Sequence, residues 1–244
     1  MRGSDPIFTF KTGDHTCVFY SDLEGLLEVL TPYVLEGLKN NQRCLCAQRA
    51  DTLEALAADL QFLGVDVKKE TRRGALELYD ADRIYVPDGR FEPSTMITLL
   101  ERSVRDSVGA GFSGFRAAGD LAWAVEGHNE CDRLIEYEEM VDRWFPGKPI
   151  VGLCQYAIRE FTPRTLDAAM NAHSKILDMS VSTNASLQIR DSRCDAEIIR
   201  DTGTWPPVYR YVVELESGDV FRGKSADCAD TLKLVEDLIA AQSQ

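Results

Sequence analysis

The sequence lacks the phosphate-binding motif of nucleotide-hydrolysing α/β proteins. No Gly-x-x-x-x-Gly-Lys-Ser/Thr segment occurs in its 244 residues, although that loop and its lysine hold the phosphates in such proteins. Gly109–Gly114 matches the dinucleotide pattern Gly-x-Gly-x-x-Gly, but it follows a predicted helix and precedes a strand, which is the wrong order. The serine-hydrolase and zinc-protease motifs are absent as well. We therefore expect neither enzymatic activity nor a cofactor.

Positive charge is scarce. The chain has 27 lysines and arginines against 40 acidic residues, a net charge of −13. An acidic surface of this kind repels phosphate backbones, so we expect no direct binding to nucleic acid. The short basic pairs Lys68-Lys69 and Arg72-Arg73 are more consistent with a solvated helix end than with a binding patch.

Long apolar runs are also missing. The longest apolar runs are short, such as Ile150–Cys154, and they cannot span a bilayer. Met1–Ser4 leads into Asp5-Pro6 rather than into an apolar signal sequence, and residues 1–13 resemble a vector-derived leader. The seven cysteines are an odd number, which favours buried free thiols over disulfides. These features predict a cytoplasmic protein without membrane association.

Strand-like and helix-like segments alternate between about residues 15 and 180. This alternation predicts parallel β-α units and a mostly parallel sheet covered by helices on both faces. We assign residues 14–180 to one α/β domain. Its predicted strands are Thr16–Tyr20, Arg43–Gln48, Leu76–Tyr79, Gly114–Gly119 and Pro149–Cys154.

The last part of the chain has a different pattern. Tyr209–Leu215 and Val220–Gly223 flank a turn at Ser217-Gly218-Asp219, which is typical of a β-hairpin. Ala226–Ala241 then has the apolar spacing of an amphipathic helix. Residues 186–244 are therefore predicted to form a small α+β appendage.

Polar and aromatic residues recur at the predicted strand ends. In a parallel sheet, ligands bind beyond the carboxyl ends of the strands. Tyr20 ends the first strand, Asp120 and Trp123 follow the fourth, and Cys154 and Tyr156 lie at the end of the fifth. Each residue taken singly is better explained as a cap on the core. Together they predict an aromatic-rich pocket for a small molecule.

Two of the three histidines are expected at the opposite edge of the sheet. His15 begins the first strand, and the helix Pro163–His173 runs about 16 Å back from the carboxyl edge. His15 and His173 could cap backbone groups, join a subunit interface in a homo-oligomer, or bind a metal with Cys17. We favour a structural or assembly pair and expect no metal. Glu138 is either partly buried or a solvated charge.

The ordered series of motifs resembles the methanogen/methylotroph DcmR-type sensory family, MEDS. The resemblance implies a RecA/KaiC-like fold without a phosphate loop and a role in sensing small hydrocarbon derivatives. Such domains are often joined to histidine kinases or DNA-binding domains. Many relatives have Glu at the position of Asp120, and the resemblance does not reach residues 186–244. The motifs are His15, Phe19-Tyr20, Leu30–Tyr33, Glu36–Leu38, Asp88–Phe91, Gly119–Trp123, Tyr137-Glu138, Leu153–Tyr156, Phe161–Pro163 and His173.

The sequence thus favours a non-catalytic sensory protein that binds a small, largely apolar ligand, either a hydrocarbon derivative or a one-carbon compound. Because we recognise neither a DNA-binding helix-turn-helix nor kinase motifs, the signal is expected to pass to a partner such as a histidine kinase or transcription regulator. Alternatives are a ligand-free protein-interaction module, a residual nucleotide-binding protein, and a thiol-based enzyme or sensor that uses Cys154.

Overall fold

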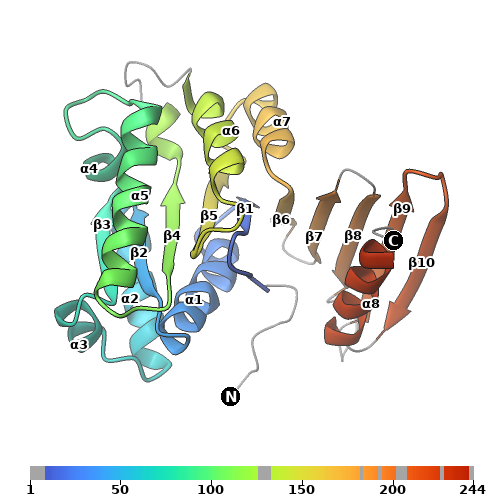
Figure 1. Cartoon of the computed structure of the whole chain (residues 1–244), viewed down its shortest axis with the longest axis horizontal. Coiled ribbons are helices and arrows are strands. Elements are labelled where there is room, and N and C mark those ends of the chain that lie inside the picture. The colour runs from blue at the N-terminus through green and yellow to red at the C-terminus, as the bar shows by residue number, and fades with distance from the viewer. Residues whose placement is uncertain are drawn as a thin grey trace.

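A computed structural model describes residues 9–125, 133–181, 184–191, 194–201, 208–225 and 228–241. Most of the predicted leader, residues 1–8, lies outside these ranges. The described strands form one ten-stranded sheet in the order β10-β9-β8-β7-β6-β1-β5-β4-β2-β3 (Figure 1).

Six neighbouring strands make up the parallel half of the sheet. All pairings from β3 through β2, β4, β5 and β1 to β6 are parallel, as the alternating pattern predicted. These strands are β1 (His15–Tyr20), β2 (Arg43–Gln48), β3 (Leu76–Asp80), β4 (Phe115–Asp120), β5 (Ile150–Ala157) and β6 (Lys175–Val181).

The fifth strand is longer than predicted. It ends at Ala157 rather than at Cys154, and every residue in it is buried. It lies between β1 and β4, and both neighbours pair with it beyond Cys154. Cys154 and Tyr156 therefore lie inside a central strand, with side chains on the same face, and the prediction that both follow a strand end was wrong.

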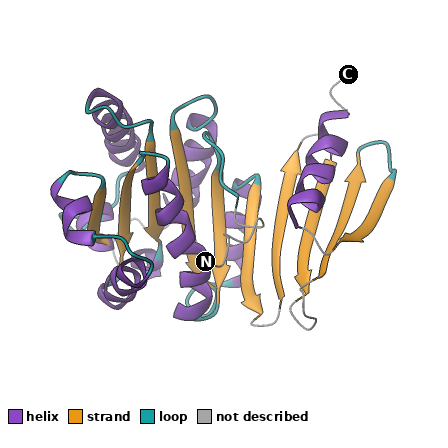
Figure 2. Cartoon of the chain, turned by 90° about the horizontal axis from the view of Figure 1, so that it is seen from below, coloured by secondary structure: helices purple, strands orange, loops and turns teal. Residues whose placement is uncertain are grey.

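Helices cover both faces of the parallel half (Figure 2). The core on one face includes residues from α1 and α2, and the core on the other includes residues from α4 to α7. The helices are α1 (Leu23–Lys39), α2 (Ala50–Phe62), α3 (Val67–Arg72), α4 (Ala81–Tyr85), α5 (Pro93–Gly109), α6 (Leu134–Trp144), α7 (Pro163–Ala172) and the 3₁₀ helix η2 (Ala122–Val125).

Local sequence explains where α7 begins and ends. The Thr162 hydroxyl accepts a hydrogen bond from the Thr165 backbone N–H, and Pro163 occupies the first turn, where its missing N–H costs nothing. His173 follows the helix in an extended conformation and leads directly into β6. The helix thus returns the chain to the amino end of β1, where His15 lies.

The C-terminal strands extend the same sheet in antiparallel fashion. These are β7 (Asn184–Asp191), β8 (Cys194–Asp201), β9 (Val208–Leu215) and β10 (Val220–Ser225). The predicted hairpin is present as β9–β10. The helix α8 (Cys228–Ala241) packs on β8, β9 and β10 (Figure 1). Within the described residues, none of the helices combines the length and apolarity needed to cross a membrane.

Candidate functional site

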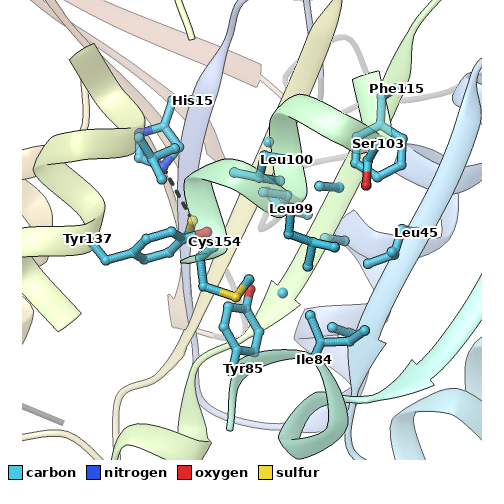
Figure 3. Close-up of a pocket in the computed structure, with 18 of the residues that line it drawn as sticks. His15, Leu45, Ile84, Tyr85, Leu99, Leu100, Ser103, Phe115, Tyr137 and Cys154 are labelled. Atoms are coloured by element: carbon cyan, nitrogen blue, oxygen red, sulfur yellow. Dashed lines mark hydrogen bonds between the residues drawn. The ribbon is translucent and has the colours of Figure 1, made fainter. Parts of the chain in front are cut away.

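A small apolar cavity lies between the sheet and the helices α4, α5 and α6. It offers about 40 Å³ to the centres of water-sized molecules. His15 and Cys154 contribute polar atoms at one end, as Figure 3 shows. Most of its other wall residues are apolar or aromatic, and they include Leu45, Tyr85, Leu100, Phe115, Tyr137 and Phe145.

An aromatic cluster supports one wall of this cavity. The rings of Tyr85 and Trp123 are stacked with their centroids 5.1 Å apart, and Phe91 lies 4.4 Å from Trp123. Gly119 permits this packing because a Cβ at that position would overlap the Tyr85 hydroxyl. Trp123 is therefore buried behind Tyr85. It supports the cavity wall without lining it.

Four side chains converge at the polar end, and we call them the histidine cluster: His15, Glu138, Cys154 and His173. All four are buried, and one nitrogen, oxygen or sulfur atom from each lies within 4.8 Å of the others. Glu138 Oε2 is 3.2 Å from His15 Nε2, 3.3 Å from Cys154 Sγ and 3.5 Å from His173 Nε2. His15 Nε2 is also 3.3 Å from Cys154 Sγ. The cluster has the residue types and the compactness of a metal-binding site.

Contacts behind the two imidazoles orient them. His173 Nδ1 lies 2.8 Å from the carbonyl oxygen of Ala169, which can only accept, so Nδ1 carries a proton and donates it. His15 Nδ1 lies 3.6 Å from Asp142 Oδ1. In both rings Nε2 is consequently the atom turned toward Glu138, and the ring centroids are 4.0 Å apart.

A glycine makes space for this arrangement. Gly152 is the register partner of His15 on β5. A Cβ there would lie 2.7 Å from the Phe145 ring, which packs against the His15 imidazole at 5.2 Å. The absence of a side chain at position 152 therefore leaves room for the Phe145 ring, and His15 lies between this ring and Cys154, two residues farther along β5.

Burial and mutual charge set the protonation of the cluster. Burial, reinforced by the Glu138 carboxylate, raises the pKa of the Cys154 thiol well above its usual value. Burial also opposes ionisation of Glu138, but the two histidines and the Tyr156 hydroxyl outweigh it and hold the pKa of Glu138 at about 2. Burial and neighbouring His15 lower the pKa of His173 to about 4. Glu138 is thus a buried carboxylate facing a thiol and a neutral imidazole.

The structure distributes the five predicted pocket residues among three places. Cys154 lines the cavity and belongs to the histidine cluster. The Tyr156 hydroxyl donates a 2.6 Å hydrogen bond to Glu138 Oε1, behind the cluster. Trp123 supports the cavity wall, whereas Tyr20 and Asp120 lie elsewhere. The predicted single pocket at the strand ends is therefore not what the geometry shows.

Tyr20 and Asp120 belong to a group that we call the carboxyl-edge cluster: Tyr20, Arg49, Asp120 and Glu160. Arg49 donates hydrogen bonds to the Tyr20 hydroxyl at 3.0 Å, to Asp120 Oδ2 at 2.9 Å and to Glu160 Oε1 at 2.8 Å. Asp120 Oδ1 accepts the backbone N–H of Ala122. The functional groups of this cluster satisfy one another at the edge where nucleotides bind in related sheets.

His15 and His173 lie side by side, as predicted, but they are not remote from the cavity. Tyr20 and His15 do belong to different clusters, but the predicted membership was wrong for Cys154, which lies in mid-strand and contacts His15. Glu138 was left undecided between buried and solvated, although it shares the helix face of Leu134 and Val141. Arg49 was missed, and its position directly after a strand was the signal available.

Comparison with known proteins identifies relatives of this chain. The family model of the MEthanogen/methylotroph, DcmR Sensory domain, MEDS, matches residues 14–174. The transcriptional repressor DcmR of Methylorubrum extorquens is 26% identical over 161 residues, which cover 66% of this chain and 58% of the repressor. The chain therefore matches little more than half the length of that relative.

Solved structures share the fold at low sequence identity. An uncharacterized protein from Pyrococcus horikoshii, crystallised with an unknown peptide, superposes with a TM-score of 0.54 at 12% identity, covering 88% of this chain and 93% of that one. A KaiC-like protein from the same organism gives a TM-score of 0.47 at 10% identity, covering 88% and 91%. The first of these shows that the fold of this chain also occurs in a solved protein.

Proposed function

Because the chain belongs to the MEDS family of sensory domains, we propose that it is a non-catalytic sensor that binds a small, largely apolar molecule in the cavity beside the histidine cluster. The observation that carries this proposal is the cavity itself, an apolar space next to the central strands of the parallel half. Apolar cavities of this kind stay dry and take up small apolar ligands.

The size of the cavity limits the ligand. A water molecule needs about 10–15 Å³ of this measure, so the 40 Å³ available corresponds to roughly three water positions. That volume suits a molecule of one or two carbons with a few substituent atoms. The wall is mostly apolar with a thiol and an imidazole at one end, which favours a hydrocarbon derivative with a single polar or polarisable group.

The similarity to a transcriptional repressor supports a regulatory output. We propose that ligand binding shifts the helices around the cavity and that the change is read by a partner, such as a transcription regulator or histidine kinase, or across a homo-oligomer. Five described cysteines are buried free thiols, which suits a reducing cytoplasm.

Ligand binding is tested through the thermal unfolding midpoint. Chloroform and methanol serve as one-carbon probes, each added below the concentration at which it denatures proteins. Binding at ten times Kd stabilises the native state by about 1.4 kcal/mol, which raises the midpoint by roughly 3–6 °C in a chain of this size.

A pair of variants separates cavity binding from a general solvent effect. Leu100→Phe fills the cavity, whereas Leu60→Phe overpacks the other face of the sheet, away from it. The proposal requires that the midpoint shift disappear in Leu100→Phe and persist in Leu60→Phe. If neither probe raises the midpoint of the unaltered chain, the sensor proposal fails and a ligand-free interaction module takes its place.

A further inference from the structure

We propose that the histidine cluster binds one divalent transition-metal ion, with Zn²⁺ the expected occupant, through His15 Nε2, Glu138 Oε2, Cys154 Sγ and His173 Nε2. This inference goes beyond the sensory proposal and does not depend on it. It stands on the geometry, the charge and the hydrogen bonding of the cluster.

The spacing of the four atoms matches a tetrahedral site. Zn²⁺ binds nitrogen and oxygen at about 2.0–2.2 Å and thiolate sulfur at about 2.3 Å, so tetrahedral ligand atoms lie roughly 3.3–3.6 Å apart. The separations among Glu138, His15 and Cys154 are 3.2, 3.3 and 3.3 Å, and Glu138 lies 3.5 Å from His173. All pairs lie within 4.8 Å. Only small adjustments are needed to place an ion between them.

The ligand charges balance the ion. Two neutral imidazoles, one carboxylate and one thiolate carry a total charge of −2, which a divalent cation neutralises. Neutrality matters here because all four residues are buried, where an uncompensated charge is costly. When the ion binds, the Cys154 thiol loses its proton to solvent, as does a protonated His15 at Nε2, and the sulfur and the nitrogen take the ion in place of those protons.

The hydrogen bonding leaves a buried nitrogen available. His173 Nε2 is fully buried and has no hydrogen-bond partner, while its Nδ1 is held by Ala169. Metal-binding histidines usually show this arrangement, with one nitrogen on a carbonyl or carboxylate and the other on the ion. His15 differs in that its Nδ1 faces Asp142 Oδ1 at 3.6 Å, which is beyond hydrogen-bond distance.

The ligand set favours zinc over harder cations. Mixed nitrogen and sulfur ligands in a tetrahedral arrangement are typical of zinc, whereas Mg²⁺ and Ca²⁺ require sites built from oxygen. The ligands come from β1, α6, β5 and the end of α7, and an ion would hold two helices against two central strands. Because His15 and Cys154 also line the cavity, the ion would lie behind its polar wall.

The test uses the full chain stripped of metal and reconstituted with Co²⁺, which reports its coordination by visible spectroscopy. One equivalent of Co²⁺ per chain is expected, with the intense d–d absorption of a tetrahedral site and a thiolate-to-cobalt charge-transfer band. Zn²⁺ should displace it stoichiometrically. If the unaltered chain binds no stoichiometric Co²⁺, or binds it without a thiolate band, the proposal is overturned.

Two cysteine variants identify the thiolate. Cys154→Ala should abolish the charge-transfer band, whereas Cys17→Ala should retain it. Cys17 is the matched control, since it is the register partner of Cys154 on β1 and equally buried on the same face. A band that survives in Cys154→Ala contradicts the assignment. If Cys154→Ala fails to fold, His173→Gln is used in its place. This variant should bind Co²⁺ at least tenfold more weakly and show a changed d–d spectrum. Unchanged affinity and an unchanged spectrum would contradict the proposed site.

Discussion

The two polar clusters of the parallel half differ in whether their buried polar atoms all have hydrogen-bond partners. In the carboxyl-edge cluster, Arg49 is 38% exposed and ties a tyrosine and two carboxylates together. In the histidine cluster, four buried groups surround a point and a nitrogen has no partner. The groups of the first cluster hydrogen-bond to one another, and the second leaves a buried nitrogen without a hydrogen-bond partner.

Because of this difference, the groups that remain available for binding do not lie at the carboxyl edge of the sheet. Open parallel sheets bind ligands beyond the carboxyl ends of their strands, and in this chain an arginine and its partners occupy that position. The cavity lies instead between the sheet and α4, α5 and α6, with His15 and Cys154 at one end (Figure 3). The histidine cluster adds Glu138 from α6 and His173 from the end of α7. A sheet can therefore retain its architecture while its reactive groups lie under the helices on one face.

The largest expected effect comes from removing the buried carboxylate at the centre of the histidine cluster. Glu138→Gln should lower the free energy of unfolding by about 3–5 kcal/mol, because it breaks a fully buried charged network. Asp120→Asn, the matched change in the carboxyl-edge cluster, should cost about 1–2 kcal/mol. Urea denaturation of both variants measures the two values. Equal losses would show that the clusters are energetically alike.

Metal removal should have the next largest effect, confined to the histidine cluster. An ion at a thousand times its Kd stabilises the native state by about 4 kcal/mol, so a strong chelator should lower the unfolding midpoint by roughly 8–16 °C. The chelator should lower the unfolding midpoint of Asp120→Asn by the same amount, and it should lower the midpoint of His173→Gln only slightly. A chelator that leaves the unaltered chain's midpoint unchanged argues against a bound ion.

The smallest effect is expected at the carboxyl edge. Arg49→Met should destabilise the chain by about 1 kcal/mol, since the arginine is partly exposed, and salt should reduce the difference. Arg105→Met is the control, because Arg105 is exposed and pairs with its neighbour Asp106; it should change stability by under about 0.5 kcal/mol. Urea titrations at low and high salt make the comparison. A salt-independent loss at Arg49 would mean that packing, rather than charge, holds this cluster.

The parallel architecture could be predicted because strand and helix periods alternate cleanly along residues 15–180. The position of Cys154 could not, because a polar Gln155 follows it and makes the strand look finished. The strand continues because it pairs with β4 as far as Gln155 and with β1 as far as Ala157. Local sequence carries no information about such neighbours.

Part of the histidine cluster could be predicted from the sequence. Helix length predicted that His173 lies near His15. The burial of Glu138 stayed open between two alternatives, although helical spacing sets it on one face with Leu134 and Val141. The missing step was the register between β1 and β5, which brings Cys154 within reach of His15. Register between strands so far apart in the chain depends on the whole sheet, and no short motif encodes it.

The wide sequence separation within the histidine cluster has a consequence for how the chain folds. His15 and Cys154 are 139 residues apart, so their contact requires closure of a very long loop, which is entropically costly and slow. The other two members come from α6 and the end of α7. The cluster is therefore complete only when both strands and both helices are in place. Any ion it takes up would report a completed parallel half.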